Sequence, residues 1–239
     1  MAGLTTIALI ERRADISRDL FTRYWRDVHG VMAARIPGFE SYVQHHVTRT
    51  LGEADAIEFE GIAVVRFACE ADRAGLGQSA IAAQIVRDEP NVFTRALLYN
   101  LAADDSRRIN EDTAADRDDT GFLLFGDAAA GETWAAAAGE AGMEVHFHDL
   151  RGGDPSLWNG IEAGAVSWQA VAQYWAGECE GPPPPEGVTA FRTDERYVMV
   201  EGGRPTPIGL RGADAVRTIR EIGAQNQLEG EVETLIYGV

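Results

Sequence analysis

The side chains best suited to proton transfer gather on one predicted helix. Phe21, Trp25 and His29 follow one another at four-residue steps, so they share one helix face. Surrounding aromatic rings lower the pKa of an imidazole unless an acid pairs with it, and the neutral ring can then accept a proton near neutral pH. We therefore expect His29 to act as a general base, assisted by Tyr24 or by His46. The alternative is a core histidine that bonds a backbone carbonyl near the helix end.

A row of polar side chains follows on the next predicted strand. Because alternate residues of a strand point to the same face, Tyr42, Gln44 and His46 lie together. Such a row could line a cavity and hold a carbonyl or phenol oxygen, while Trp25 stacks against a flat ligand. The alternative is that this face meets solvent and that His45, on the opposite face, is the buried residue.

A similar row, Glu144, His146 and His148, occurs in the second half of the chain. If the two strands occupy equivalent places in two similar halves, these rows face each other, and His146 and His148 contact the substrate. Two histidines at alternate positions beside a carboxylate can also bind a divalent metal. This spacing is common by chance, so we expect no metal and no bound cofactor.

The composition excludes several classes of protein. The chain of 239 residues has a net charge of −17, and all 21 of its basic residues are arginine. Without lysine there is no side-chain Schiff base and no Walker-type phosphate-binding lysine. An acidic surface repels nucleic acids and anionic membranes. There is also no GxGxxG or GxSxG motif, which leaves nicotinamide, flavin and acyl-enzyme chemistry without support.

Cysteine usage and hydropathy indicate a cytoplasmic protein. Cys69 and Cys179 are far apart in unlike surroundings, so we expect two packing thiols rather than a disulfide or a zinc site. No apolar run approaches the roughly 18 residues that a membrane span needs, and the N-terminus does not resemble a signal peptide.

The elements that must position these side chains follow a recognisable order. Apolar residues recur at three- and four-residue steps from Ser17 to Ile36, which predicts one amphipathic helix ended by Pro37-Gly38. The remaining predicted elements of this half are strands at Thr5–Arg12, Phe39–Arg49, Gly61–Cys69 and Arg95–Ala103 and an alanine-rich helix within 70–93. The order β-α-β-β-α-β is ferredoxin-like.

The same rhythm restarts after a charged segment. We predict a domain at 1–105, an acidic linker at 106–120 and a second, degenerate ferredoxin-like domain at 121–239. The predicted elements of the second domain are strands at Gly121–Gly126, Met143–Leu150, Ala165–Ala176, Arg196–Val200 and Glu231–Val239 and helices at Ala128–Ala141 and Leu210–Leu228. The fold class is α+β. Two such halves can pack sheet on sheet into one barrel whose interior is a natural small-ligand cavity.

The first hundred residues resemble the EthD family. The resemblance rests on the spacing F-x-x-Y-W-x-x-x-H-x(7)-P-G-x-x-x-Y from Phe21 to Tyr42, on FEGIAVVRF at 59–67 and on DEPNVF at 88–93. It implies a dimeric α/β-barrel fold, here formed within one chain, and it adds weight to a catalytic role for His29. This fold hosts cofactor-free monooxygenases, cyclases, isomerases and decarboxylating lyases, so the resemblance does not imply one reaction.

These observations favour a cofactor-independent lyase, isomerase or cyclase. Its partner would be a small hydrophobic molecule, an aromatic or polyketide-like carbonyl or phenol compound, and not a nucleic acid or a membrane. A cofactor-free monooxygenase of a phenol is the closest alternative. A non-catalytic ligand carrier is the rival from another class, and a structural or partner-binding protein is the third. The fused barrels could also associate as a homodimer.

Overall fold

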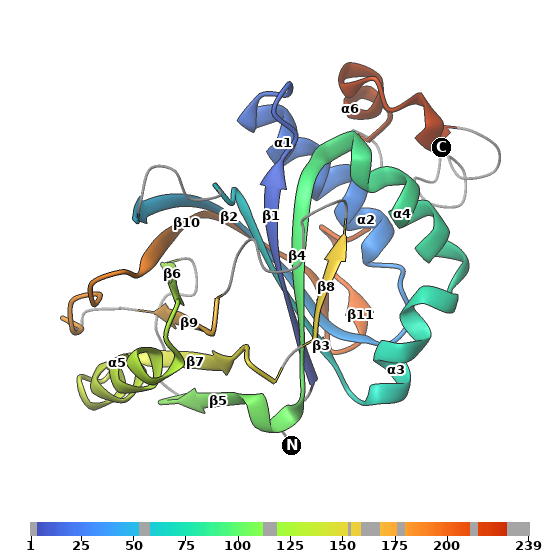
Figure 1. Cartoon of the computed structure of the whole chain (residues 1–239). Coiled ribbons are helices and arrows are strands. Elements are labelled where there is room, and N and C mark those ends of the chain that lie inside the picture. The colour runs from blue at the N-terminus through green and yellow to red at the C-terminus, as the bar shows by residue number, and fades with distance from the viewer. Residues whose placement is uncertain are drawn as a thin grey trace.

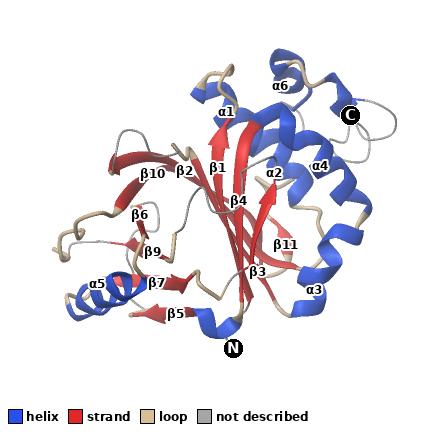
Figure 2. Ribbon diagram, in the orientation of Figure 1, coloured by secondary structure: helices blue, strands red, loops and turns tan. Residues whose placement is uncertain are grey.

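The computed structural model describes residues 4–52, 58–111, 119–152, 154–158, 168–175, 180–210 and 215–228. Within these ranges the chain forms one curled antiparallel sheet, with helices on its outer faces (Figures 1 and 2). The strand order is β5-β7-β9-β6-β10-β2-β3-β1-β4-β8, and β11 pairs with β10. No helix in the described ranges combines the length and the apolarity needed to cross a membrane.

The first half has the predicted ferredoxin-like order. Its elements are β1 (Leu4–Arg12), α1 (Arg18–Tyr24), a π-helical turn η1 (Trp25–His29), α2 (Gly30–Ala33), β2 (Phe39–Leu51), β3 (Gly61–Phe67), α3 (Glu70–Gly75), the 3-10 turn η2 (Leu76–Gln78), α4 (Ala80–Val92) and β4 (Phe93–Leu101). The strands lie side by side as β4-β1-β3-β2, and every pair is antiparallel. The helix α1 begins at an N-cap, since the Ser17 side chain accepts a hydrogen bond from the Leu20 amide at 3.1 Å.

The second half repeats this strand order. Its elements are β6 (Thr120–Phe125), α5 (Ala128–Glu140), β7 (Glu144–Asp149), β8 (Asp154–Trp158), β9 (Ala170–Trp175), β10 (Thr189–Glu201), β11 (Arg204–Pro205), α6 (Ala215–Ile222) and the 3-10 turn η4 (Gln225–Leu228). Taken as first to fourth strand, β6, β7, β9 and β10 lie in the order β10-β6-β9-β7, which matches the first half. Between β9 and β10 the described residues contain no helix, and residues 182–185 are four consecutive prolines.

The two halves share one sheet because β10 pairs with β2 over most of its length. The two edges of this sheet also lie near each other. Only four residues separate the end of β4, next to the edge strand β8, from β5 (Ser106–Ile109), which pairs with β7 and forms the other edge. Likewise, β7 is followed within a few residues by β8, which pairs with β4. Since a residue spans at most about 3.6 Å, the sheet must curl strongly.

The inner face of the curled sheet is packed with apolar side chains. The buried cluster there draws on strands of both halves and includes Ile7, Leu97, Phe122 and Phe191. The outer face of the first half is covered by α1, α2 and α4, and α6 packs on α1 and η1 (Figure 1). All four helices share a second cluster with that face, and α5 covers the outer face of the second half. A large cavity lined by described residues lies on the outer face of the first half, whereas we expected a ligand cavity between the two sheets.

Several boundaries differ from those predicted. Ser106–Ile109, assigned to the linker, forms strand β5, which we missed because its charged residues lie at a sheet edge and show no apolar alternation. Within the helix predicted at Leu210–Leu228, the described residues form α6 and η4, separated by a turn at Gly223. The strand at Glu231–Val239 and Cys179 lie outside the described residues.

Candidate active site

A cavity of about 760 Å³ lies between the outer face of the first-half sheet and the helices that cover it. Its floor is formed by alternate residues of three strands, among them Ala8, Ala63 and Leu98. Its walls come from η1 and α2 on one side and from α3, η2 and α4 on the other. Most of the lining is aliphatic or aromatic, which suits a flat hydrophobic ligand.

Trp25 and His29 reach this cavity from the π-helical turn η1. The Gly30 amide bonds to the Trp25 carbonyl, five residues back, instead of four. Such a turn is wider than an α-helical one and is often found at functional sites. The same carbonyl also accepts a hydrogen bond from Gln44 Nε2 at 2.9 Å. On β3, Gly61 leaves room for the Trp25 indole, because a Cβ at this position would lie 2.5 Å from the ring.

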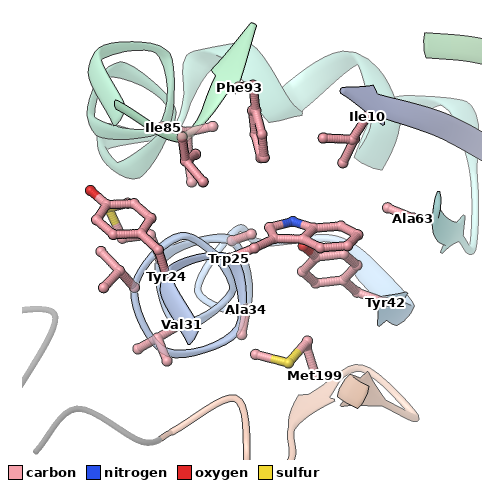
Figure 3. Close-up of a cluster of buried hydrophobic side chains, with 14 of the residues drawn as sticks. Ile10, Tyr24, Trp25, Val31, Ala34, Tyr42, Ala63, Ile85, Phe93 and Met199 are labelled. Carbon is pink, nitrogen blue, oxygen red and sulfur yellow. The ribbon is translucent and has the colours of Figure 1, made fainter. Parts of the chain in front are cut away.

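Figure 3 shows the apolar surroundings of this turn. The Trp25 indole lies between Tyr42 on one side and Phe93 on the other. The Trp25 and Phe93 rings meet edge to face with centroids 6.4 Å apart. Phe93 also meets the His29 imidazole edge to face at 4.9 Å. The imidazole thus packs against the Phe93 ring at the cavity wall.

His29 is paired with a carboxylate that the sequence analysis did not single out. The imidazole Nδ1 lies 2.9 Å from Oδ2 of Asp88 on α4, and both side chains are buried. The Tyr24 hydroxyl donates to the other oxygen of Asp88 at 2.5 Å. When Nδ1–H donates to a carboxylate, Nε2 of a neutral imidazole carries the lone pair. His29 lines the cavity, and its Nε2 makes no hydrogen bond to a described residue, so Nε2 is the nitrogen that can meet a ligand.

Beside Asp88 lies a second buried carboxyl group, Glu89, which is 3% exposed. Burial and the charge of Asp88 raise the pKa of Glu89 to about 9. Glu89 is therefore protonated at neutral pH. Its Oε1 has no hydrogen-bond partner among the described residues.

The polar row of β2 is buried against the helix side of the sheet, and only Tyr42 lines the cavity. The Tyr42 hydroxyl accepts a hydrogen bond from Gln44 Nε2 at 2.8 Å. The amide of Gln44 is thus engaged with protein groups rather than with the cavity. The expectation that both residues orient a ligand oxygen fits the geometry of Tyr42 better than that of Gln44.

His46 lies at the end of the same row and away from the cavity lining. Its ring contacts Trp25 at 4.6 Å and Tyr197 at 5.3 Å between centroids. Burial and then the charges of Arg26 and Arg18 lower the pKa of His46 to about 3. Neither ring nitrogen has a hydrogen-bond partner among the described residues, so His46 acts in this structure as a packing group beside Trp25.

His146 and His148 lie on the other side of the sheet from His29. His146 faces Gln173 across the β7–β9 pair, and Gln173 lies 3.4 Å from His45 on the inner face. His146 pairs with Glu144 at 3.2 Å, and His148 Nδ1 lies 2.8 Å from the Ser106 hydroxyl. The two polar rows therefore do not face each other. Strand alternation defines two faces but does not say which face of β2 meets helices and which meets the other half.

Across the described ranges, no group of three or more histidine, cysteine, aspartate or glutamate side chains is placed to hold a metal ion.

Asp88 was missed because it lies 59 residues from His29 in sequence. The signal that could have found it is local. Asp88 and Glu89 are consecutive acids in an otherwise alanine-rich amphipathic stretch, at positions that face the core with Ile85 and Val92. A buried acid on an apolar helix face requires a polar partner. His29 was the buried polar residue to which no side-chain partner had been assigned.

The first half is thus a ferredoxin-like α+β unit with a histidine–aspartate pair at a cavity between helices and sheet. Residues 13–95 match the model of the EthD domain, which confirms the resemblance of this half to the EthD family. No curated protein matches the sequence.

Solved structures of low identity resemble parts of the chain. An anthrone oxidase-like protein is 9% identical, covering 86% of this chain and 97% of its own with a TM-score of 0.49. A candidate monooxygenase from Lactobacillus acidophilus NCFM is 13% identical, covering 86% and 100% with a TM-score of 0.45. An EthD family protein from Bacillus halodurans C-125 is 17% identical, covering 40% and 95% with a TM-score of 0.31.

Proposed function

We propose that this protein is an enzyme that moves protons on a small, flat, hydrophobic carbonyl or phenol compound. The observation that carries the proposal is the buried hydrogen bond between His29 and Asp88 at the wall of an apolar cavity. A carboxylate that fixes the tautomer of an imidazole and stabilises its protonated form is a common way to build a general base. The reaction class is lyase, isomerase or cyclase.

In the proposed mechanism, the substrate lies on the floor of strand residues with one face toward Trp25. Nε2 of His29 removes a proton from the carbon next to the carbonyl group or from a phenol oxygen. The imidazolium that forms is stabilised by Asp88, which Tyr24 holds from its other oxygen. Returning the proton to another carbon completes an isomerisation, and giving it to a leaving oxygen completes an elimination. A positioned base of this kind supplies roughly 10²–10⁴-fold of the rate.

Deuterium uptake tests this proposal without knowledge of the natural substrate. In D₂O, 2-tetralone exchanges the protons at its C1 carbon slowly, and NMR follows the loss of their signal. We expect the protein to accelerate this exchange and the His29→Gln variant to lose about 10²-fold or more of the acceleration. If the wild-type protein gives the buffer rate, or if His29→Gln exchanges as fast as wild type, the proposal is wrong.

Two other functions remain as alternatives. A monooxygenase would pass electrons from a phenolate to O₂, so oxygen consumption with an electron-rich naphthol would depend on His29. A carrier would bind naphthols in the cavity with the same affinity in wild type and His29→Gln and would accelerate neither reaction. The histidine–aspartate pair favours an enzyme over a carrier, because ligand binding alone does not require a fixed imidazole tautomer.

We also propose that residues 121–239 are a degenerate ferredoxin-like copy of the first half. Support comes from the shared strand order of the two halves and from the pairing of β10 with β2. In the described residues, the second copy shows neither a helix in the place of α4 nor a counterpart of the His29–Asp88 pair. Its part in this proposal is to pack against the inner face of the first sheet.

A further inference from the structure

The charges that line the cavity have the opposite sign to the charge of the protein. The chain carries 38 acidic and 21 basic residues. Yet among the described residues that line the cavity there are two arginines, Arg73 and Arg87, and no aspartate or glutamate. A cavity with this lining favours a ligand that carries negative charge.

Part of the polar lining, including Thr6 and Asn100, lies at the end of the cavity remote from His29. There the Thr6 hydroxyl donates to Oδ1 of Asn100 at 2.8 Å, across the β1–β4 pair. This bond fixes the orientation of the amide, so the Nδ2 group of Asn100 is the donor available to a ligand. Nδ2 has no hydrogen-bond partner among the described residues, and Asn100 lines the cavity.

Arg73 from α3 adds charge at this end. Its guanidinium donates to the Leu101 carbonyl at 2.7 Å, which anchors it beside Asn100. It also pairs with Glu70, but that carboxylate is 64% exposed, so water and salt screen its charge. The guanidinium has five N–H groups and keeps donors free for a ligand.

The spacing of the two ends is set by the strands of the floor. Thr6 and Ile10 are four residues apart on β1, which corresponds to about 13 Å. Phe93, which holds the His29 ring, pairs with the far end of β1, beyond Ile10. Asn100 lies opposite Thr6 at the other end.

We infer that Asn100 and Arg73 form a subsite for a carboxylate at the end of the substrate remote from the carbon or oxygen that His29 attacks. The substrate is then an elongated aromatic acid, with a carbonyl or phenol at one end and a carboxylate at the other. This inference rests on the proposed function for the orientation of the substrate, but the subsite itself is defined by binding alone.

Two probes that differ in charge test the subsite by isothermal titration calorimetry. The compound 6-hydroxy-2-naphthoate has a phenol and a carboxylate at opposite ends of a flat two-ring body, and 6-hydroxy-2-naphthamide has the same shape without the charge. We expect wild type to bind the acid about tenfold or more tightly than the amide. Asn100→Asp keeps the acceptor for Thr6 but replaces the amide donor by an anion, and it should abolish or reverse this preference. Arg73→Met keeps an apolar stem without the charge and should reduce the preference to below threefold.

Arg192→Met is the matched control, because Arg192 is 64% exposed on β10 and does not line the cavity. It should keep the full preference for the acid. Equal affinity of wild type for the two probes, no binding of either, or a preference that survives in both Asn100→Asp and Arg73→Met overturns the subsite. The variant His29→Gln separates this inference from the proposed function. If it keeps the preference for the acid and loses deuterium exchange, both the subsite and the role of His29 are supported. If it keeps the preference and also exchanges as fast as wild type, the subsite stands and the role of His29 is refuted.

Discussion

Replacing Asp88 by asparagine removes the charge of the proposed pair and keeps its shape. The asparagine has two orientations, and each impairs the base. If its carbonyl oxygen accepts from His29, the imidazolium that forms during turnover has no carboxylate to stabilise it. If its amide donates to Nδ1 instead, Nε2 becomes the protonated nitrogen and cannot accept a proton. We expect the rate of 2-tetralone exchange to fall about 10²–10⁴-fold, which corresponds to about 3–5 kcal/mol in the barrier.

The same variant changes stability less than activity. Asp88 accepts hydrogen bonds from the Tyr24 hydroxyl and from Asn91 Nδ2 and pairs with His29, and the asparagine retains neutral versions of the contacts with Tyr24 and His29. Hydrogen bonds to charged groups contribute about 1.5–3 kcal/mol and neutral ones about 0.5–1.5 kcal/mol. The free energy of unfolding should therefore fall by about 1–3 kcal/mol, measured by urea denaturation, and the protein should stay folded in the assay.

Glu89→Gln is the matched control for this experiment. It changes the adjacent buried acid in the same chemical way, but Glu89 is already protonated at neutral pH, so exchange activity should stay within about threefold of wild type at pH 7. The reasoning is refuted if folded Asp88→Asn exchanges as fast as wild type, or if Glu89→Gln loses as much activity as Asp88→Asn.

Three further predictions concern stability. The pKa of Glu89 is raised from 4.5 to about 9, so the contribution of this group to folding stability is complete below pH 4.5 and is lost as pH rises toward 9. Relative to Glu89→Gln, the free energy of unfolding of wild type should fall by about 2–3 kcal/mol between pH 5 and 7, measured by urea denaturation. A constant difference between the two proteins would contradict this. The pKa of His46 is lowered from 6.5 to about 3, so the contribution of this group to folding stability is complete above pH 6.5 and is lost as pH falls toward 3. The free energy of unfolding of wild type should fall by about 2 kcal/mol relative to His46→Phe between pH 7.5 and 5. If the two proteins lose stability in parallel over this range, His46 is solvated. Gly61→Ala places a Cβ 2.5 Å from the rigid Trp25 ring and should cost about 1–3 kcal/mol with a shift in tryptophan fluorescence, whereas unchanged fluorescence and stability would mean that the indole does not pack on β3.

Periodicity in the sequence was sufficient for the first half of the fold. The three- and four-residue steps from Ser17 to Ile36 predicted a helix that the structure has, interrupted only by the π-helical turn at Trp25–His29. The extra residue of that turn rotates the later residues about the helix axis, but by less than the width of the apolar face. The pattern of apolar residues therefore does not reveal the turn. The alternation on β2 likewise predicted that Tyr42, Gln44 and His46 share a face, but not that both faces of β2 are buried.

The parts that the sequence did not predict depend on contacts distant along the chain. The partner of His29 lies 59 residues away on another helix, and nothing in the spacing of the first helix points to it. The location of the cavity depends on how α4 packs over β1 and β4, which local patterns do not determine. Strand β5 lies at a sheet edge, where charged side chains are common, so its sequence looks like that of a linker.

A crystal structure with bound 6-hydroxy-2-naphthoate would show where the proposed substrate lies relative to His29. We expect the ligand between the helices and the outer face of the first-half sheet, with its phenol oxygen within hydrogen-bond distance of His29 Nε2 and with Nδ1 still bonded to Asp88. A ligand bound instead on the inner face of the curled sheet, near His45 and His146, would contradict the account.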